Sequence, residues 1–409
     1  MSAFHHLVTE QPPQVQALDL GENTACVLLK KRSIVVRETP MPILQPDGVL
    51  VKVIASGICG SDLHNYTAGG VGGRPVTEPL VMGHESAGEV IAVGDMVKTH
   101  KVGDRVAVEP GLPCRRCKNC KEGRMNICLD AHYCGSPGSV GSLSRYFALP
   151  ADMAPHIPDT LSWEEAGSIQ PLAIGVNIAR RADLRAHQTL AVIGTGPIGL
   201  ITGAVARAYG LSKIVGFDVN PKRVEFARKY KDPSGRAVFD HVFVVPELPT
   251  ALPAKNGNAN GASHDDEEEV PVGDIKYEAA KRNAAAYLKE CGVDSEGFER
   301  VVEASGAEDG GMLGVALAQM GATYLAVGLG HHQTNRFPTL AVTNKELDVK
   351  GITRYTAPCF PNAIDLLARN AVDLKQLITK VLPLSRSKDA FDAVESGEEI
   401  KVIIKNQEM

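Results

Sequence analysis

A short apolar segment followed at once by a glycine-rich turn constrains this chain more than any other feature. The run from Leu190 to Ile193 predicts a buried strand, and the turn after it opens an apolar helix that extends to Tyr209. A second strand, Lys213 to Phe217, ends in Asp218, about 20 residues beyond the glycines. This order is typical of a dinucleotide site in a doubly wound α/β sheet, because the amides and dipole at the helix N-terminus favour an anionic pyrophosphate. An ordinary βαβ crossover is the alternative.

The charge at the end of the second strand indicates which dinucleotide binds. The Asp218 carboxylate can bind the ribose hydroxyls of the adenosine, whereas it repels a 2′-phosphate. No arginine follows it immediately, so NAD is expected rather than NADP. The residues predicted to bind the coenzyme here are Gly194, Gly196, Pro197, Ile198, Gly199 and Asp218.

A set of three metal-ligating residue types stands nearer the N-terminus. Cys59 and the pair His84-Glu85 are flanked by glycines, which allow the backbone to turn tightly beside an ion. A thiolate, an imidazole and a carboxylate can hold zinc with three protein ligands and leave one coordination position open for catalysis. Ser61 and His64 follow Cys59 and offer a hydroxyl and a titratable ring for proton transfer. A core histidine beside a surface acid is the competing interpretation.

Four more cysteines lie at the short spacing of a closed zinc site. Four thiolates can surround one zinc ion and leave no position open, which predicts a structural role. The residues between them are too polar for four unrelated buried cysteines. Five arginines and lysines in the segment either offset the thiolate charge or mark a zinc ribbon that binds nucleic acid. The cysteines of this lobe, at about residues 110–130, are Cys114, Cys117, Cys120 and Cys128.

Two of these motifs carry a family resemblance. GICGSDLH at residues 57–64 and GHESAGEV at residues 83–90 resemble the zinc-dependent medium-chain alcohol dehydrogenases. The similarity is closest to their polyol branch, which contains the sorbitol, xylitol and L-arabinitol dehydrogenases. The four-cysteine spacing also matches the structural zinc lobe of that family. The resemblance therefore implies two zinc ions in each chain, one catalytic and one structural.

The resemblance implies an α/β fold of two domains. A GroES-like, β-rich catalytic domain is expected at residues 25–172 and 346–409, and a Rossmann coenzyme domain with a doubly wound parallel sheet at residues 173–345. An acidic, glycine-rich run at about 246–273 has too little apolar area to fold and is interpreted as an inserted loop. Residues 1–24 are expected to form an extension that is loosely ordered or lies on a partner subunit.

A reaction also follows from the resemblance. It implies the reversible, NAD-linked oxidation of a secondary hydroxyl of a sugar alcohol to a ketose, with zinc acting as a Lewis acid. In the family, the serine two residues and the histidine five residues after the ligand cysteine take and relay the proton, which assigns these roles to Ser61 and His64.

Two positions of the expected substrate pocket depart from the family. Gln170 stands where the polyol enzymes have a glutamate near the zinc, and Asn65 where the sorbitol enzymes usually have a tyrosine. A neutral amide is a poor zinc ligand, so Gln170 is expected to contact a bound water or a substrate hydroxyl. The residues assigned by resemblance are Arg223, Val327, Gly328 and Leu329 at the coenzyme and Asn65, Gln170, Arg354 and Tyr355 at the substrate.

These departures leave the identity of the substrate open. A dehydrogenase of another alcohol or amino-alcohol, similar to threonine dehydrogenase, is one alternative. A catalytically silent NAD-binding scaffold is another, although the complete set of Cys59, Ser61, His64, His84 and Glu85 argues against it.

Composition excludes several other classes of function. The net charge of -5 and the pI near 6.2 give no basic field for nucleic acid or a membrane surface. No apolar run is long enough to span a bilayer, and the first 20 residues lack the pattern of a signal peptide, so a cytoplasmic location is expected. Nine cysteines, an odd number clustered at metal spacing, favour reduced thiols. A homo-tetramer is expected by family analogy alone.

Overall fold

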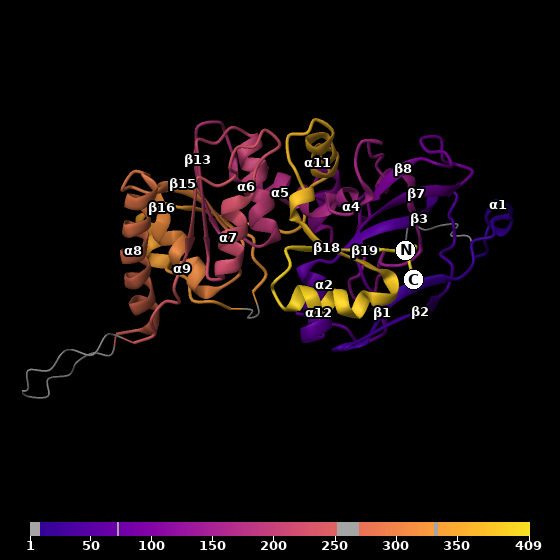
Figure 1. Ribbon diagram of the computed structural model, residues 1–409, viewed down its shortest axis with the longest axis horizontal. Coiled ribbons are helices and arrows are strands. Elements are labelled where there is room, and N and C mark those ends of the chain that lie inside the picture. The colour runs from indigo at the N-terminus through magenta and orange to yellow at the C-terminus, as the bar shows by residue number, and fades with distance from the viewer. Residues whose placement is uncertain (1–8, 72, 252–269, 331–333) are drawn as a thin grey trace, which may run out of the picture. The chain divides into compact units, whose positions relative to one another are not determined.

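The computed structural model describes residues 9–71, 73–251, 270–330 and 334–409 (Figure 1). Most of the predicted acidic loop, residues 252–269, lies outside the described residues. The chain divides into two compact units, Met1–Asn177 with Thr353–Met409 and Ile178–Ile352. The sequence placed these boundaries after residues 172 and 345. Among the described residues, no helix is both long and apolar enough to cross a membrane.

The first unit is organised around an antiparallel pair of strands that end at the metal-ligating segments. Strand β3 (Gly48–Gly57) pairs with β7 (Glu85–Val93), with Gly57 opposite Glu85. The C-terminal strand β19 (Lys401–Lys405) pairs with the other edge of β3. Alternate valines of β3 are fully buried and pack into the core of this unit. The strands of this sheet lie in the order β18 (Ile378–Pro383), β19, β3, β7 and β8 (Arg105–Val108), and β11 (Tyr146–Pro150) also pairs with β3.

The remaining elements of the first unit are short. They are α1 (Pro13–Gln16), β1 (Asn23–Lys30), β2 (Ser33–Thr39), α2 (Gly60–Ala68), β4 (Gly70–Val71), β5 (Arg74–Pro75), β6 (Leu80–Val81), β8 (Arg105–Val108), β9 (Gly111–Leu112), α3 (Lys118–Lys121), η1 (Met125–Ile127), β10 (His132–Tyr133), β11 (Tyr146–Pro150), η2 (Ala151–Met153), α4 (Trp163–Ala166), α5 (Ile169–Ala182, which continues into the second unit), α11 (Cys359–Ala368), η3 (Lys375–Leu377), β18 (Ile378–Pro383), η4 (Leu384–Arg386) and α12 (Ser387–Glu395).

The second unit contains a six-stranded parallel sheet of order β14-β13-β12-β15-β16-β17, as predicted. Figure 1 shows helices α6 and α7 on one side of the strands and α8 and α9 on the other. The strand order reverses between β12 and β15, and ligands bind at the carboxyl ends of strands at such a switch point. The bounds are β12 (Thr189–Ile193), α6 (Pro197–Ala208), β13 (Lys213–Asp218), α7 (Pro221–Lys229), β14 (His241–Val244), α8 (Val272–Cys291), β15 (Phe298–Glu303), α9 (Glu308–Leu317), β16 (Ala318–Ala326), α10 (Thr339–Asn344) and β17 (Asp348–Gly351).

Two local expectations differ from the structure. In the sequence, the capping box Ser162–Glu165 predicts a single helix from Trp163 toward Ala182, bent at Pro171. This prediction is wrong, because the chain forms α4 and α5 with a break before Ile169. Pro171 lies in the first turn of α5, where its missing N–H is not needed. The described part of the N-terminal segment packs on its own chain: Val15 is buried against the core, and the Tyr146 hydroxyl donates to the Leu20 carbonyl over 2.6 Å.

Candidate metal centres and coenzyme site

Three predicted ligands lie together at the ends of β3 and β7. The ligating atoms of Cys59, His84 and Glu85 are all within 4.8 Å of one another. Cys59 begins helix α2, whereas His84 and Glu85 enter β7. The Ser61 hydroxyl donates to Cys59 Sγ over 3.3 Å and lies 3.4 Å from His84 Nε2. His64 lies half-buried on α2. The residues present therefore suit a zinc ion with three protein ligands.

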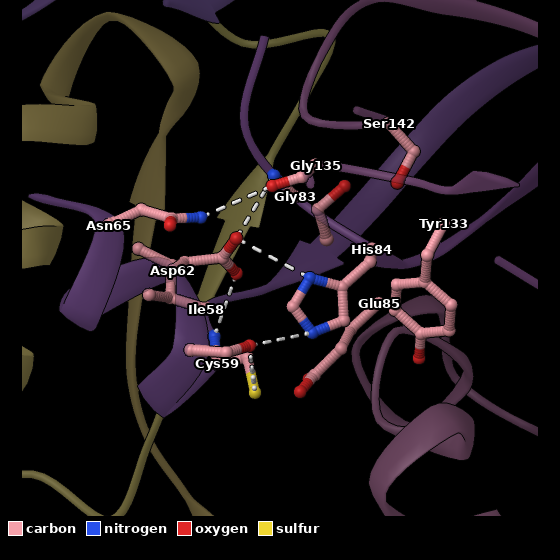
Figure 2. Close-up of polar contacts among 12 residues, drawn as sticks. Ile58, Cys59, Asp62, Asn65, Gly83, His84, Glu85, Tyr133, Gly135 and Ser142 are labelled. Carbon is pink, nitrogen blue, oxygen red and sulfur yellow. Dashed lines mark hydrogen bonds and ion pairs between the residues drawn. The ribbon is translucent and has the colours of Figure 1, made fainter. Parts of the chain in front are cut away.

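Asp62, which the sequence did not single out, orients the histidine. Its carboxylate is buried, accepts the backbone N–H groups of Cys59 and Gly83 over 3.2 and 3.3 Å, and lies 3.4 Å from His84 Nδ1. Figure 2 shows the His84 ring with one nitrogen toward Asp62 and the other toward the Cys59 side. Burial lowers the pKa of His84, but Asp62 and Cys59 outweigh it and hold the pKa well above its usual value. A carboxylate three residues after Cys59, at the start of a helix, is the signal that predicts this contact.

Lys401 is a second residue that the sequence did not single out. Its Nζ forms a buried ion pair with Glu85 and donates to the Ile58 carbonyl over 3.1 Å. Gly57 leaves room for this pair, because a Cβ there would lie 2.5 Å from Glu85 Oε2 and 2.7 Å from Lys401 Cε. The carboxylate thus contacts a cation on β19 while it lies among the metal-ligating atoms.

The four-cysteine lobe differs from the group of Cys59, His84 and Glu85 because all of its candidate ligands are sulfur atoms of one segment. Its four sulfur atoms also lie within 4.8 Å of one another. Cys120 Sγ is 3.9 Å from Cys114 Sγ and 3.5 Å from Cys117 Sγ, close to the edge of about 3.8 Å expected for tetrahedral zinc thiolates. The Cys117 backbone N–H donates to Cys114 Sγ over 3.3 Å. N–H groups of Arg116 and Cys117 lower the pKa of Cys114 to about 6, which favours the thiolate that binds zinc.

In the glycine turn of the second unit, backbone atoms lie too close together to leave room for a side chain. Gly194 has a φ of +91°, and a Cβ on Gly199 would lie 1.9 Å from the Gly194 carbonyl oxygen. Gly196 is the N-cap of helix α6, and Pro197 and Ile198 are the first two residues of the helix. Asp218 ends β13 and accepts the N–H groups of Thr195 and Asn220 over 2.7 and 2.8 Å. Arg223 reaches back toward Gly196, whose Cβ position would be 3.9 Å from the guanidinium.

Glu303, a buried residue that the sequence did not single out, binds the backbone of the segment Val327–Leu329. The Val327 and Gly328 N–H groups both donate to the Glu303 carbonyl over 2.9 Å. The Glu303 side chain accepts the N–H groups of Ser305 and Gly306 over 2.7 and 2.9 Å, and burial raises its pKa. Leu329 is 63% exposed. Glu303 therefore braces the backbone at the carboxyl ends of β15 and β16.

The predicted substrate residues fall into two groups. Gln170 and Arg354 both contact Tyr133, the first by donating its amide to the hydroxyl over 2.7 Å and the second with its guanidinium 3.7 Å from the ring centre. Figure 2 shows the Tyr133 ring beside His84. Asn65, in contrast, donates to the Gly135 carbonyl over 3.2 Å, and Tyr355 is 2% exposed. The structure gathers the first group near the metal ligands, whereas Asn65 secures the adjoining loop.

Comparison with known proteins decides the family. Residues 45–159 match the alcohol dehydrogenase GroES-like domain. A protein of Aspergillus terreus named "Probable D-xylulose reductase A" is 37% identical over 94% of this chain and 98% of its own length. The chain belongs to the zinc-dependent medium-chain alcohol dehydrogenases. Within this superfamily its relatives place it in the polyol branch.

Solved structures agree with this membership. An Escherichia coli oxidoreductase of unknown specificity has a TM-score of 0.78 at 26% identity and covers 94% of this chain and 99% of its own. An alcohol dehydrogenase of E. coli CFT073, solved with NADH, has a TM-score of 0.74 at 26% identity and covers 94% and 100%. This medium-chain dehydrogenase therefore has the predicted GroES-like domain and Rossmann-type sheet. It is an enzyme of the zinc-dependent alcohol and polyol dehydrogenase class.

Proposed function

We propose that this dehydrogenase catalyses the reversible, NAD-linked oxidation of a secondary hydroxyl of a sugar alcohol to a ketose, with D-xylulose and its polyol as the first candidates. The observation that carries the proposal is the group of Cys59, His84 and Glu85, with Ser61 in hydrogen-bond contact with two of them. The D-xylulose reductase relative supports the substrate class.

The chemistry of the donor set supports zinc at both ligand groups. Cys59, His84 and Glu85 would hold the catalytic ion, and the four cysteines of the lobe the structural one. When bound, the catalytic ion supplies a Lewis acid that favours loss of the alcohol proton. Ser61 Oγ would accept this proton while it releases its own, and His64 would pass the released proton on toward solvent. Asp62 keeps His84 oriented, and Lys401 balances part of the buried negative charge.

The coenzyme assignment rests on the shape and charge of the turn after β12. Gly194, Gly196 and Gly199 leave the α6 N-terminus open to a pyrophosphate, and Asp218 disfavours a 2′-phosphate. Bound NAD supplies the hydride acceptor. Arg223 and the segment Val327–Leu329 remain proposed contacts at the phosphate and nicotinamide sides.

The proposed substrate contacts are Gln170, Arg354, Asn65 and Tyr355. Gln170 Oε1 is buried and has no hydrogen-bond partner within the described chain, so it can accept a hydroxyl of the substrate or a water. Within the same residues, Arg354 forms no ion pair, which leaves its N–H groups for substrate hydroxyls.

The test is NADH formation with xylitol, L-arabinitol, D-sorbitol, galactitol, threonine and simple alcohols, with NADP as the coenzyme control. We expect turnover of at least one polyol with NAD and none with NADP. Activity confined to threonine or to simple alcohols would overturn the substrate class. Silence of a folded, zinc-loaded and NAD-binding sample on the whole panel would favour the scaffold alternative.

We also propose a homo-tetramer. Within the described part of the sheet, β17 has a strand partner on one side only, and exposed apolar side chains lie near this edge at Met320, Leu340 and Val349. An unpaired strand edge with apolar neighbours is suited to pairing with a second copy. Light scattering that gives the mass of a single chain of 43.6 kDa would contradict the proposal.

A further inference from the structure

The four-cysteine lobe contacts the turn that carries Arg354. Asn126, two residues before the last cysteine, donates its side-chain N–H to the Thr353 carbonyl over 2.9 Å. Tyr133, on the strand that closes the lobe, places its ring 3.7 Å from the Arg354 guanidinium. A small cavity between lobe and turn is lined by Met125, Asn126 and Tyr133 on one side and Arg354 and Tyr355 on the other. These segments lie more than 200 positions apart in the sequence.

The turn needs such contacts because its backbone is unusual. Arg354 has a φ of +53°, a left-handed conformation that costs free energy for a residue with a side chain. Two asparagine side chains hold its flanking carbonyls: Asn126 binds that of Thr353, and Asn177 donates to that of Arg354 over 3.0 Å. Side-chain hydrogen bonds therefore stabilise two consecutive peptide groups of the strained turn, and Asn126 of the lobe supplies one of these bonds.

Tyr133 links the same arginine to the catalytic ligands. Its ring contacts the Arg354 guanidinium on one side and lies 5.6 Å from the His84 ring. Its hydroxyl accepts the Gln170 amide over 2.7 Å, so its own proton remains available as a donor. Burial disfavours the charged form of Arg354 and lowers its pKa, which the face of the aromatic ring partly offsets. Arg354 is thus preorganised beside the ligand group rather than freely mobile.

We infer that the four-cysteine lobe sets polyol affinity, because its Asn126 and Tyr133 are positioning residues that hold Arg354 toward substrate hydroxyls other than the reacting one. The inference rests on the proposed polyol dehydrogenase function. Structural zinc then acts on the substrate pocket as well as on stability, through the backbone that it fixes around Asn126.

The lobe supplies a matched control. Asn119 also donates its side-chain N–H to one backbone carbonyl, that of Ile127 over 3.0 Å, but this bond stays inside the lobe. We expect Asn126→Ala to raise the KM for the polyol about fivefold, the effect of one lost hydrogen bond of about 1 kcal/mol, with kcat and the KM for NAD little changed. Asn119→Ala should lower thermal stability at unchanged KM. Zinc content is measured in every sample.

A double-mutant cycle separates positioning from general destabilisation. If Asn126 acts through Arg354, Asn126→Ala adds no further increase in KM to an Arg354→Ala enzyme. Additive effects, or equal effects of Asn126→Ala and Asn119→Ala on the polyol KM, would overturn the inference. A wild-type enzyme that turns over no polyol would instead defeat the proposed function, so the two failures are distinguishable.

Discussion

The two metal-ligand groups of the first unit differ in how much of the chain each requires. The four cysteines come from one segment, Cys114–Cys128, and their sulfur atoms receive N–H groups of the same segment. The group of Cys59, His84 and Glu85 joins two strands and a helix, and it depends on Asp62 and on Lys401 of the last strand. A closed site can be local, whereas an open site must be held in place by the surrounding fold.

The largest effect should come from removing a ligand of the open group. Cys59→Ala is expected to lower kcat/KM on the polyol by at least about 10³, because the Lewis acid is worth several kcal/mol in the transition state. The variant should bind one zinc fewer per chain and keep its thermal transition. Cys291→Ala, which removes a buried thiol of the other unit, is the control and should retain turnover. Turnover that survives Cys59→Ala would remove the zinc mechanism.

The closed group should respond in the opposite way. Cys120→Ser is expected to release the lobe zinc and to lower the melting temperature by about 5 °C or more, since metal binding at such a site contributes folding free energy. The maximal rate should fall far less than in Cys59→Ala, because none of the three catalytic ligands lies in the lobe. Calorimetry with zinc analysis checks the first effect and steady-state kinetics the second. Equal losses of kcat in both variants would abolish the distinction.

A smaller effect is expected at Gly57, where the absence of a side chain leaves space for Glu85 of the open group. Gly57→Ala would place a Cβ 2.5 Å from Glu85 Oε2 and 2.8 Å from the Gly167 carbonyl oxygen, so we expect a loss of about 1–3 kcal/mol in stability together with weaker zinc retention. Gly60→Ala is the matched control, because no atom lies within 4 Å of its Cβ position. Denaturant unfolding and zinc analysis should separate the pair, and identical behaviour would show that the spacing around Glu85 is unimportant.

The smallest effect concerns Glu109, a buried carboxylate that forms no ion pair within the described residues. Burial and the nearby Asp152 raise the pKa of Glu109 to about 8, whereas the same group titrates near 4.3 in an unfolded chain. Because the folded pKa is the higher one, stability is greatest below about 4.3 and is lost as the pH rises through about 8. Glu109→Gln is expected to remove this loss and to add about 1–2 kcal/mol near pH 8.5. Unfolding curves of both proteins at pH 6 and 8.5 measure this gain. If the free energy of unfolding changes with pH in the same way in Glu109→Gln and in the wild type, the raised pKa of Glu109 is contradicted.

Residues with local signals were predictable from the sequence. The glycine turn before α6, the four cysteines, the Ser162–Glu165 capping box and the strand Lys401–Lys405 all have signatures within a few positions, and the structure contains each of them. Nothing near Lys401 in the sequence indicates its partner, because Glu85 is 316 positions away. Tyr133 gave no signal for the same reason.

Other differences arose where packing overrides local pattern. The pattern from Trp163 to Ala182 predicts one helix, but α4 packs against β3 and the chain breaks directly after it, at Gly167. The N-terminal segment shows little periodicity in the sequence, yet Val15 is buried in the core and Leu20 packs against the same cluster.

We propose that one zinc site of this chain is catalytic and open while the other is structural and closed. Stepwise chelation distinguishes the two sites when zinc content, NADH formation on the polyol and circular dichroism are measured on the same sample. We expect turnover to disappear as the first zinc leaves, with about one zinc per chain retained and the fold unchanged. Turnover that persists after the first zinc has left, or loss of both ions together with unfolding, would contradict it.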